Sequence, residues 1–174
     1  MDMSDSIEIA APREIVFDAL TDPEVLKACV PGCTEMTGSV EDGFEATVVQ
    51  KVGPVKATFR GKVTVSDMVP PEKLTISGEG KGGAAGFAKG GAEVTLTGIE
   101  GGTRLDYKVE AKVGGKLAQL GGRIIDGFAR KMAAEFFDRL KTAVEPGGDA
   151  DEEAETEEPT AKRGWFARLR GKGG

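Results

Sequence analysis

The chain has 174 residues, of which 23 are Lys or Arg and 29 are Asp or Glu, so its formal net charge is −6 at pH 7. It contains no histidine, which excludes Ser-His-Asp and Cys-His catalytic sets and histidine-ligated metals. The length suits one domain with a substantial core, and no apolar run approaches the length of a membrane span.

The N-terminal part predicts a strand and two short helices. Alternating side chains over residues 6–9 predict the strand, and Pro12 followed by apolar residues on one side predicts a helix. A second helix is expected to begin where Thr21 or Asp22 can cap it, and to end at residues 30–32. Residues 1–12 have neither a basic region nor an apolar core, so we expect no secretory signal and a cytoplasmic protein.

The two cysteines, Cys29 and Cys33, have a C-x3-C spacing that differs from zinc ribbons and thioredoxin-type motifs. Two cysteines are also too few to hold an iron–sulfur cluster. We therefore expect both to be small buried side chains in a reducing compartment, with no metal site and no covalently bound cofactor.

From Val40 onward the hydrophobic pattern has period two, which is typical of strands. Successive strands are predicted at Val40 and at residues 44–52, 55–65, 74–78, 92–99 and 103–113. Short turns separate them, so we expect an antiparallel meander. Residues 78–83 (GEGKGG) match G-x-G-x-x-G, but they lead into another strand instead of a helix, so we interpret this region as a flexible hairpin.

Residues 115–144 predict one long helix, because apolar residues recur there at every fourth position. The repeating residues are Leu120, Ile124, Phe128, Met132, Phe136, Leu140 and Val144. This stripe rotates around a helix of about 3.6 residues per turn, so its two halves must face different surroundings. Gly121, Gly122 and Gly127 indicate close approach or bending. We expect an α+β fold in which the long helix lies across a curved antiparallel sheet, with the first strand and the short helices at one end.

The remaining residues divide into an acidic run and a basic, aromatic tip. Residues 145–158 contain eight acids and no Lys or Arg, which predicts an extended linker. Residues 159–174 combine five cations with aromatic and aliphatic side chains, which is typical of a peripheral anchor on an anionic membrane surface. The residues expected to bind the membrane are Lys162, Arg163, Trp165, Phe166, Arg168, Leu169 and Arg170.

Other interpretations of the tip are a handle for a protein partner, an inert solubilising tail, or a segment that folds onto the acidic linker. A nucleic-acid partner is not expected, because the whole chain is negative and has no extended basic face. The predicted organisation is a folded domain over residues 1–144, a linker over 145–158 and an anchor over 159–174, which would place the protein on the inner face of the cell membrane.

Several segments, in order, resemble the CoxG family of carbon monoxide dehydrogenase proteins. They are residues 21–26 (TDPEVL), 30–33 (VPGC), 52–57 (VGPVKA), 59–62 (FRGK) and 114–121 (GGKLAQLG). The resemblance covers about residues 4–140 and extends to the START and Bet v 1-like (SRPBCC) group. It implies a helix-grip fold, in which a curved antiparallel sheet and a long C-terminal helix enclose an apolar cavity.

The resemblance also implies an accessory protein, not an enzyme, for a carbon monoxide dehydrogenase-type molybdenum hydroxylase at the membrane. From this we expect the cavity to bind a quinone, or another isoprenoid or acyl lipid, for delivery to the enzyme as electron acceptor. The alternatives are a structural adaptor or assembly factor without ligand transfer, and a cyclase or hydrolase using Tyr107 or a carboxylate. The expected ligand-binding residues are Leu26, Val30, Phe59, Phe87, Tyr107, Leu117, Leu120, Gly121, Ile124 and Phe128.

Overall fold

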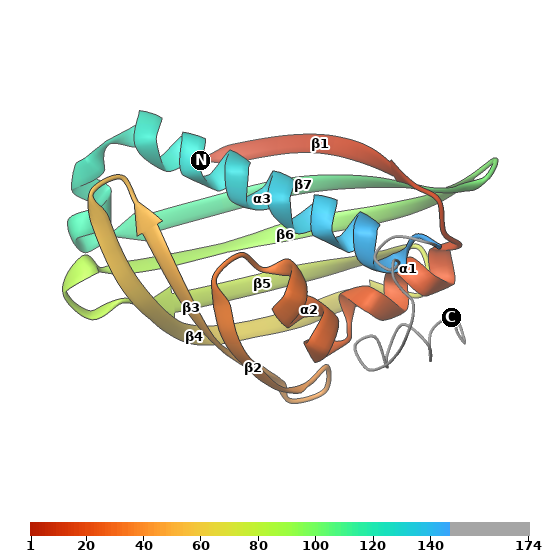
Figure 1. Cartoon of the computed structure of the whole chain (residues 1–174), viewed down its shortest axis with the longest axis horizontal. Coiled ribbons are helices and arrows are strands. Elements are labelled where there is room, and N and C mark those ends of the chain that lie inside the picture. Colours follow the sequence, from red (N-terminus) through yellow and green to blue (C-terminus); the bar gives the residue numbers. More distant parts are fainter. Residues whose placement is uncertain (147–174) are drawn as a thin grey trace.

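The computed structural model describes residues 1–146, and the predicted anchor lies outside this range. Seven antiparallel strands form one sheet in the order β1-β7-β6-β5-β4-β3-β2. The strands are β1 (Asp2–Ile9), β2 (Cys33–Ser39), β3 (Gly43–Val52), β4 (Val55–Val69), β5 (Lys73–Lys81), β6 (Phe87–Ile99) and β7 (Gly102–Gly114). Figure 1 shows that the sheet is strongly twisted and curved.

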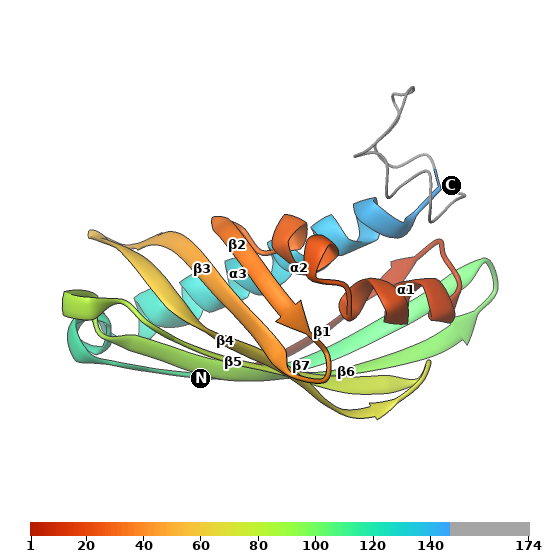
Figure 2. The same cartoon turned by 90° about the horizontal axis from the view of Figure 1, so that it is seen from below.

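Three α-helices lie on one face of this sheet: α1 (Arg13–Leu20), α2 (Pro23–Cys29) and α3 (Gly122–Val144). The helix α3 runs diagonally across the concave face, while α1 and α2 lie beside its C-terminal half (Figure 2). Two short 3-10 helices, η1 (Gly83–Ala85) and η2 (Gly115–Leu120), contact each other at the opposite end. No helix within residues 1–146 is long and apolar enough to cross a membrane.

The predicted α+β fold is confirmed, and Asp22 caps α2 by accepting a hydrogen bond of 2.8 Å from the backbone N–H of Glu24. The edge strand β2 was not predicted, because its sequence CTEMTGS lacks a clear period-two pattern. Its pairing with β3 over most of its length places it in the sheet. Val40, which was predicted to be in a strand, lies in the turn between β2 and β3.

Two predicted boundaries were wrong. The strand β6 begins at Phe87 instead of residue 92, because its Gly- and Ala-rich start pairs in register with both β5 and β7. The long helix begins at Gly122 instead of residue 115, because Gly121 has φ +93° and ψ 156° and separates η2 from α3. Side chains disfavour that backbone conformation, so the helical periodicity that begins at Leu120 does not correspond to a continuous helix.

Candidate functional site

The inner face of the sheet changes character along its strands. Toward α1 and α2 its side chains are large, and they pack with the C-terminal half of α3 into a core that includes Phe44, Leu74, Leu96, Leu105, Phe137 and Leu140. Toward η1 and η2 the inward positions of the central strands are small: Ala46, Gly61, Gly78, Gly80, Ala88, Gly90, Ala92 and Ala111. Because strand residues alternate between faces, these positions all lie opposite α3.

Strand register gathers the small residues into adjacent rows. Gly61 lies opposite Gly80, which in turn lies opposite Ala88 on the next strand. One row further along the sheet, Gly78 lies opposite Gly90, and Gly90 lies opposite Ala111. Four neighbouring strands therefore leave little side-chain volume between the sheet and the helix.

An apolar cavity of about 440 Å³ occupies this space. Its helix wall comprises Ile125, Phe128, Ala129, Met132, Ala133 and Phe136, and its sheet wall adds larger side chains such as Val48, Phe59 and Val109 around the small ones. Ligand pockets of about 300–1,000 Å³ are typical for small organic molecules. The volume and the apolar lining suit a lipophilic ligand of that class.

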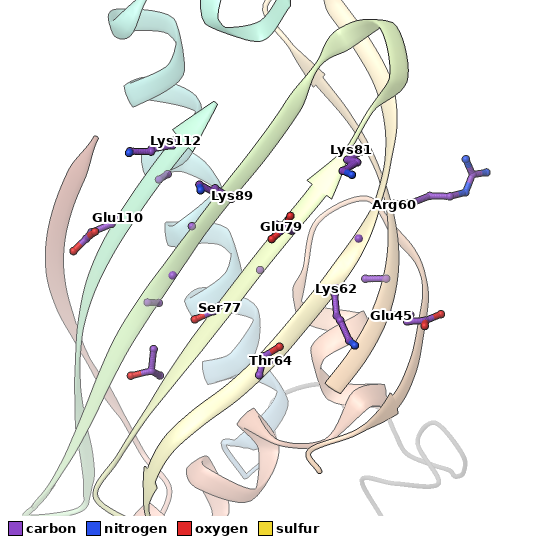
Figure 3. Close-up of a pocket in the computed structure, with 18 of the residues that line it drawn as sticks. Glu45, Arg60, Lys62, Thr64, Ser77, Glu79, Lys81, Lys89, Glu110 and Lys112 are labelled. Atoms are coloured by element: carbon purple, nitrogen blue, oxygen red, sulfur yellow. The ribbon is translucent and has the colours of Figure 1, made fainter. Parts of the chain in front are cut away.

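Gln50 brings a polar side chain to this cavity from the inner face of β3. Its Nε2 donates a hydrogen bond to the carbonyl oxygen of Pro31, which orients the amide. An amide nitrogen has two N–H groups, so one remains for another acceptor. Lys62, Glu79, Lys89 and Lys112 also border the cavity, but alternation directs their side chains to the outer face, where Figure 3 shows them.

A larger polar hollow of about 1250 Å³ crosses the outer face of the sheet (Figure 3). Its lining consists mainly of charged side chains together with Thr and Ser, most of them exposed to solvent. Binding sites for small ligands usually bury most of the ligand surface in an apolar setting. We therefore take the smaller cavity beneath α3 as the candidate ligand site.

Of the ten residues expected to bind ligand, five line the cavity: Leu26, Val30, Phe59, Leu117 and Phe128. The other five, Phe87, Tyr107, Leu120, Gly121 and Ile124, do not line it. Whether the five lining residues bind a ligand stays a prediction.

Phe87 and Tyr107 are displaced for opposite reasons. Phe87 points to the outer face of β6 and is 44% exposed, because the true start of this strand puts it out of phase with Ala88. Tyr107 is 4% exposed and stacks on Phe137 with ring centroids 4.2 Å apart, so it belongs to the packed core.

The remaining three positions lie at the junction between η2 and α3. Gly121 has no atom within 4 Å of the position where a Cβ would be, so it points into open space instead of into the cavity. Leu120 and Ile124 lie near Gly53 at the tip of the β3–β4 hairpin, and Ile124 is 41% exposed. Because the helix begins at Gly122, the first turn of the predicted stripe faces this hairpin tip.

Sequence reasoning missed Met36, Gln50, Ala129, Met132 and Ala133 as lining residues. The signal that would have found the small sheet residues was the occurrence of Gly or Ala at alternate positions of several strands. That signal marks a cavity only when the register is known, because the small residues must face one another across strands.

The ionisable groups give little support to a catalytic role at this site. Burial raises the pKa of the Tyr107 phenol, and the charge of Asp5 raises it further, so the phenol stays protonated at neutral pH. Its ring also lies outside the cavity lining. Within residues 1–146, no group of three or more Cys, Asp or Glu side chains is arranged to hold a metal ion.

A model of the carbon monoxide dehydrogenase CoxG family matches residues 6–145. The chain belongs to this family. A conserved protein from Geobacillus kaustophilus is similar to this CoxG-family chain, with 30% sequence identity and a TM-score of 0.76. The match covers 83% of this chain and 95% of that protein. A search of curated proteins returned no match.

More distant structures share the fold of this CoxG-family protein. A START superfamily protein from Mycobacterium smegmatis matches with 15% identity and a TM-score of 0.61, over 82% of this chain and 96% of that one. Ara h 8.0201 matches with 12% identity and a TM-score of 0.55, over 83% of this chain and 97% of that one. The expected family and the helix-grip fold are thus confirmed.

Proposed function

We propose that this CoxG-family protein is a membrane-tethered carrier. Its apolar cavity holds a quinone, or a similar isoprenoid or acyl lipid, and presents it as electron acceptor to a carbon monoxide dehydrogenase-type molybdenum hydroxylase. The observation that supports this most strongly is the pair of facing glycine and alanine rows beneath α3. Glycine weakens strand interiors, so such rows are unfavourable unless the space they leave is used.

The chemistry of a quinone fits both parts of the cavity lining. Its isoprenoid tail gains free energy when apolar side chains such as Phe128 and Met132 remove it from water. Its carbonyl oxygens need hydrogen-bond donors, and the free N–H of Gln50 supplies one at the cavity wall. A purely aliphatic ligand would leave that donor without a partner, which favours a ligand with a polar head.

Tethering is proposed to come from residues 159–174, which lie outside the described part of the chain. A dehydrogenase that works in the cytoplasm needs an acceptor that resides in the membrane, and an isoprenoid quinone does not cross water unaided. A cavity on a tethered domain solves this transport problem, and the acidic linker gives the domain reach.

Replacing Ala129 by Leu tests the carrier proposal. Ala129 lines the cavity from α3, so the Ala129→Leu side chain fills space that the ligand needs. We expect binding of a short-tailed quinone, followed by fluorescence titration, to weaken by more than about tenfold. The melting temperature should fall little, because an open cavity accepts volume that a packed core would not.

Ala134→Leu is the matched control, since Ala134 lies on the opposite side of the same helix and does not line the cavity. It should bind quinone like the unmodified protein. If Ala129→Leu also binds quinone normally, the cavity is not the site. If it loses quinone binding but fully supports quinone-linked turnover of the dehydrogenase, the protein acts as a structural adaptor and not as a carrier.

A further inference from the structure

The outer face of the sheet carries a charge pattern that changes from one end to the other. Over most of the face, opposite charges lie directly across neighbouring strands, as in Glu45 with Lys62 and Glu93 with Lys108. Toward η1 this pattern is reversed, because Arg60 lies opposite Lys81 and Lys89 lies opposite Lys112. Like charges directly across a strand pair are destabilising, so this arrangement needs another explanation.

An exposed aromatic ring lies among these cations. Phe87 lies opposite Lys81 on one neighbouring strand and opposite Gly114 on the other, and Lys89 is two residues further along the same face. Its ring covers Gly114 and occupies the space that a Cβ there would need, so the glycine gives the ring its resting place. We call Arg60, Lys81, Phe87, Lys89 and Lys112 the basic corner.

Further cations gather at the same end of the domain. Lys51 lies opposite Lys56 at the tip of the β3–β4 hairpin, Lys116 is in η2 and Arg123 begins α3, and all four side chains are exposed. Residues 1–146 contain 18 cationic and 22 acidic side chains, so this end is positive although the domain is negative. The two ion pairs in that part of the chain, Arg104–Asp106 and Lys141–Glu145, involve none of these cations.

We propose that the basic corner is a docking surface for the anionic leaflet of a phospholipid membrane. Each lysine near such a surface attracts anionic headgroups, and a partly exposed aromatic ring gains from burial among them. Lysine also suits this setting because its long stem lets the charge reach the headgroups while the ring inserts. The corner is separate from the predicted anchor, since the chain leaves α3 at the opposite end of the domain (Figure 1).

Docking through the basic corner would bring the cavity close to the lipid. Ala88 and Val113, which line the cavity, are the sequence neighbours of Phe87 and Lys112 on the same strands. The proposal nevertheless rests on the charge pattern and the exposed ring alone. It holds whether or not the cavity carries quinone, and vesicles without quinone test it.

The first experiment measures binding of the full chain to vesicles of phosphatidylcholine, with and without phosphatidylglycerol. The double variant Lys89→Gln/Lys112→Gln should lose about fivefold in affinity per lysine for the anionic vesicles. The control Lys62→Gln/Lys108→Gln removes the same charge from the same face, where each lysine lies opposite a glutamate. The control should lose clearly less, and equal losses, or no loss in either variant, would overturn the proposal.

The second experiment reads insertion of the ring directly. In a chain carrying Trp165→Phe, the substitution Phe87→Trp places the single tryptophan at the basic corner, and Thr64→Trp places it at mid-sheet on the same face. Anionic vesicles with brominated lipid should blue-shift and quench the emission from position 87 and leave position 64 unchanged. No shift at 87, an equal response at 64, or a response at 87 to the purified dehydrogenase but not to vesicles would refute membrane docking.

Discussion

At the scale of single residues, the two cysteines differ more than their spacing suggests. Cys29 is 1% exposed, and burial raises the pKa of its thiol to about 12, an effect that the charge of Arg139 only partly opposes. Cys33 is half-buried, and its Sγ donates a 3.2 Å hydrogen bond to the carbonyl of Glu35. Burial raises the pKa of Cys33 as well, against smaller opposing effects of that hydrogen bond and of Lys27.

This difference predicts selective alkylation. Because the thiolate is the reactive form, raised pKa values make both thiols slow at neutral pH, and the rate at Cys33 should increase as the pH rises. We expect iodoacetamide to modify Cys33 in the folded protein and to reach Cys29 only after unfolding. Peptide mapping by mass spectrometry at several pH values checks this. Equal labelling of both cysteines in the folded protein would show that α2 opens readily.

At the scale of elements, most strands follow from period two, since long paired strands such as β4 and β7 alternate clearly in burial. The missed edge strand β2 depends on partner pairing, which local pattern does not contain. The cavity depends on register, because Gly61 and Gly80 are merely weak strand formers until β4 and β5 are aligned. Half of the expected ligand residues were misplaced because the helix start and the start of β6 were each assigned several residues from their true positions.

Two glycines beside the helix start predict opposite effects on stability. Gly127 lies within α3 with open space at the Cβ position, so Gly127→Ala should stabilise the fold by about 0.5–1 kcal/mol. Gly121 has φ +93°, so Gly121→Ala should destabilise it by about 1–3 kcal/mol even though nothing is nearby to clash. Urea unfolding of both variants measures the difference, and a stabilising Gly121→Ala would mean that η2 and α3 form one continuous helix in solution.

At the scale of the whole molecule, the two ends of the domain have different tasks. The end with α1 and α2 holds the packed core, and there Glu145 accepts a 2.9 Å hydrogen bond from the backbone of Ala10 and pairs with Lys141 at 3.0 Å. These contacts fix the last turn of α3, after which the acidic run begins. The other end combines the cavity with the cationic side chains and contributes little to the buried core.

The final prediction separates the two proposed membrane contacts. Deleting residues 159–174 should leave the melting temperature unchanged, because the buried core already ends at Val144. Binding to anionic vesicles should fall by more than about tenfold, since the deletion removes five cations worth about 1 kcal/mol each together with Trp165 and Phe166.

What remains should depend on the basic corner, so adding Lys89→Gln/Lys112→Gln to the truncated chain should abolish binding. The corner acts through charge, and its residual binding should weaken steeply as salt is raised. Calorimetry and vesicle flotation over a salt series supply both measurements. Undiminished binding after truncation would remove the anchor from the proposed function. Residual binding that ignores both lysines would instead place the second contact elsewhere on the domain.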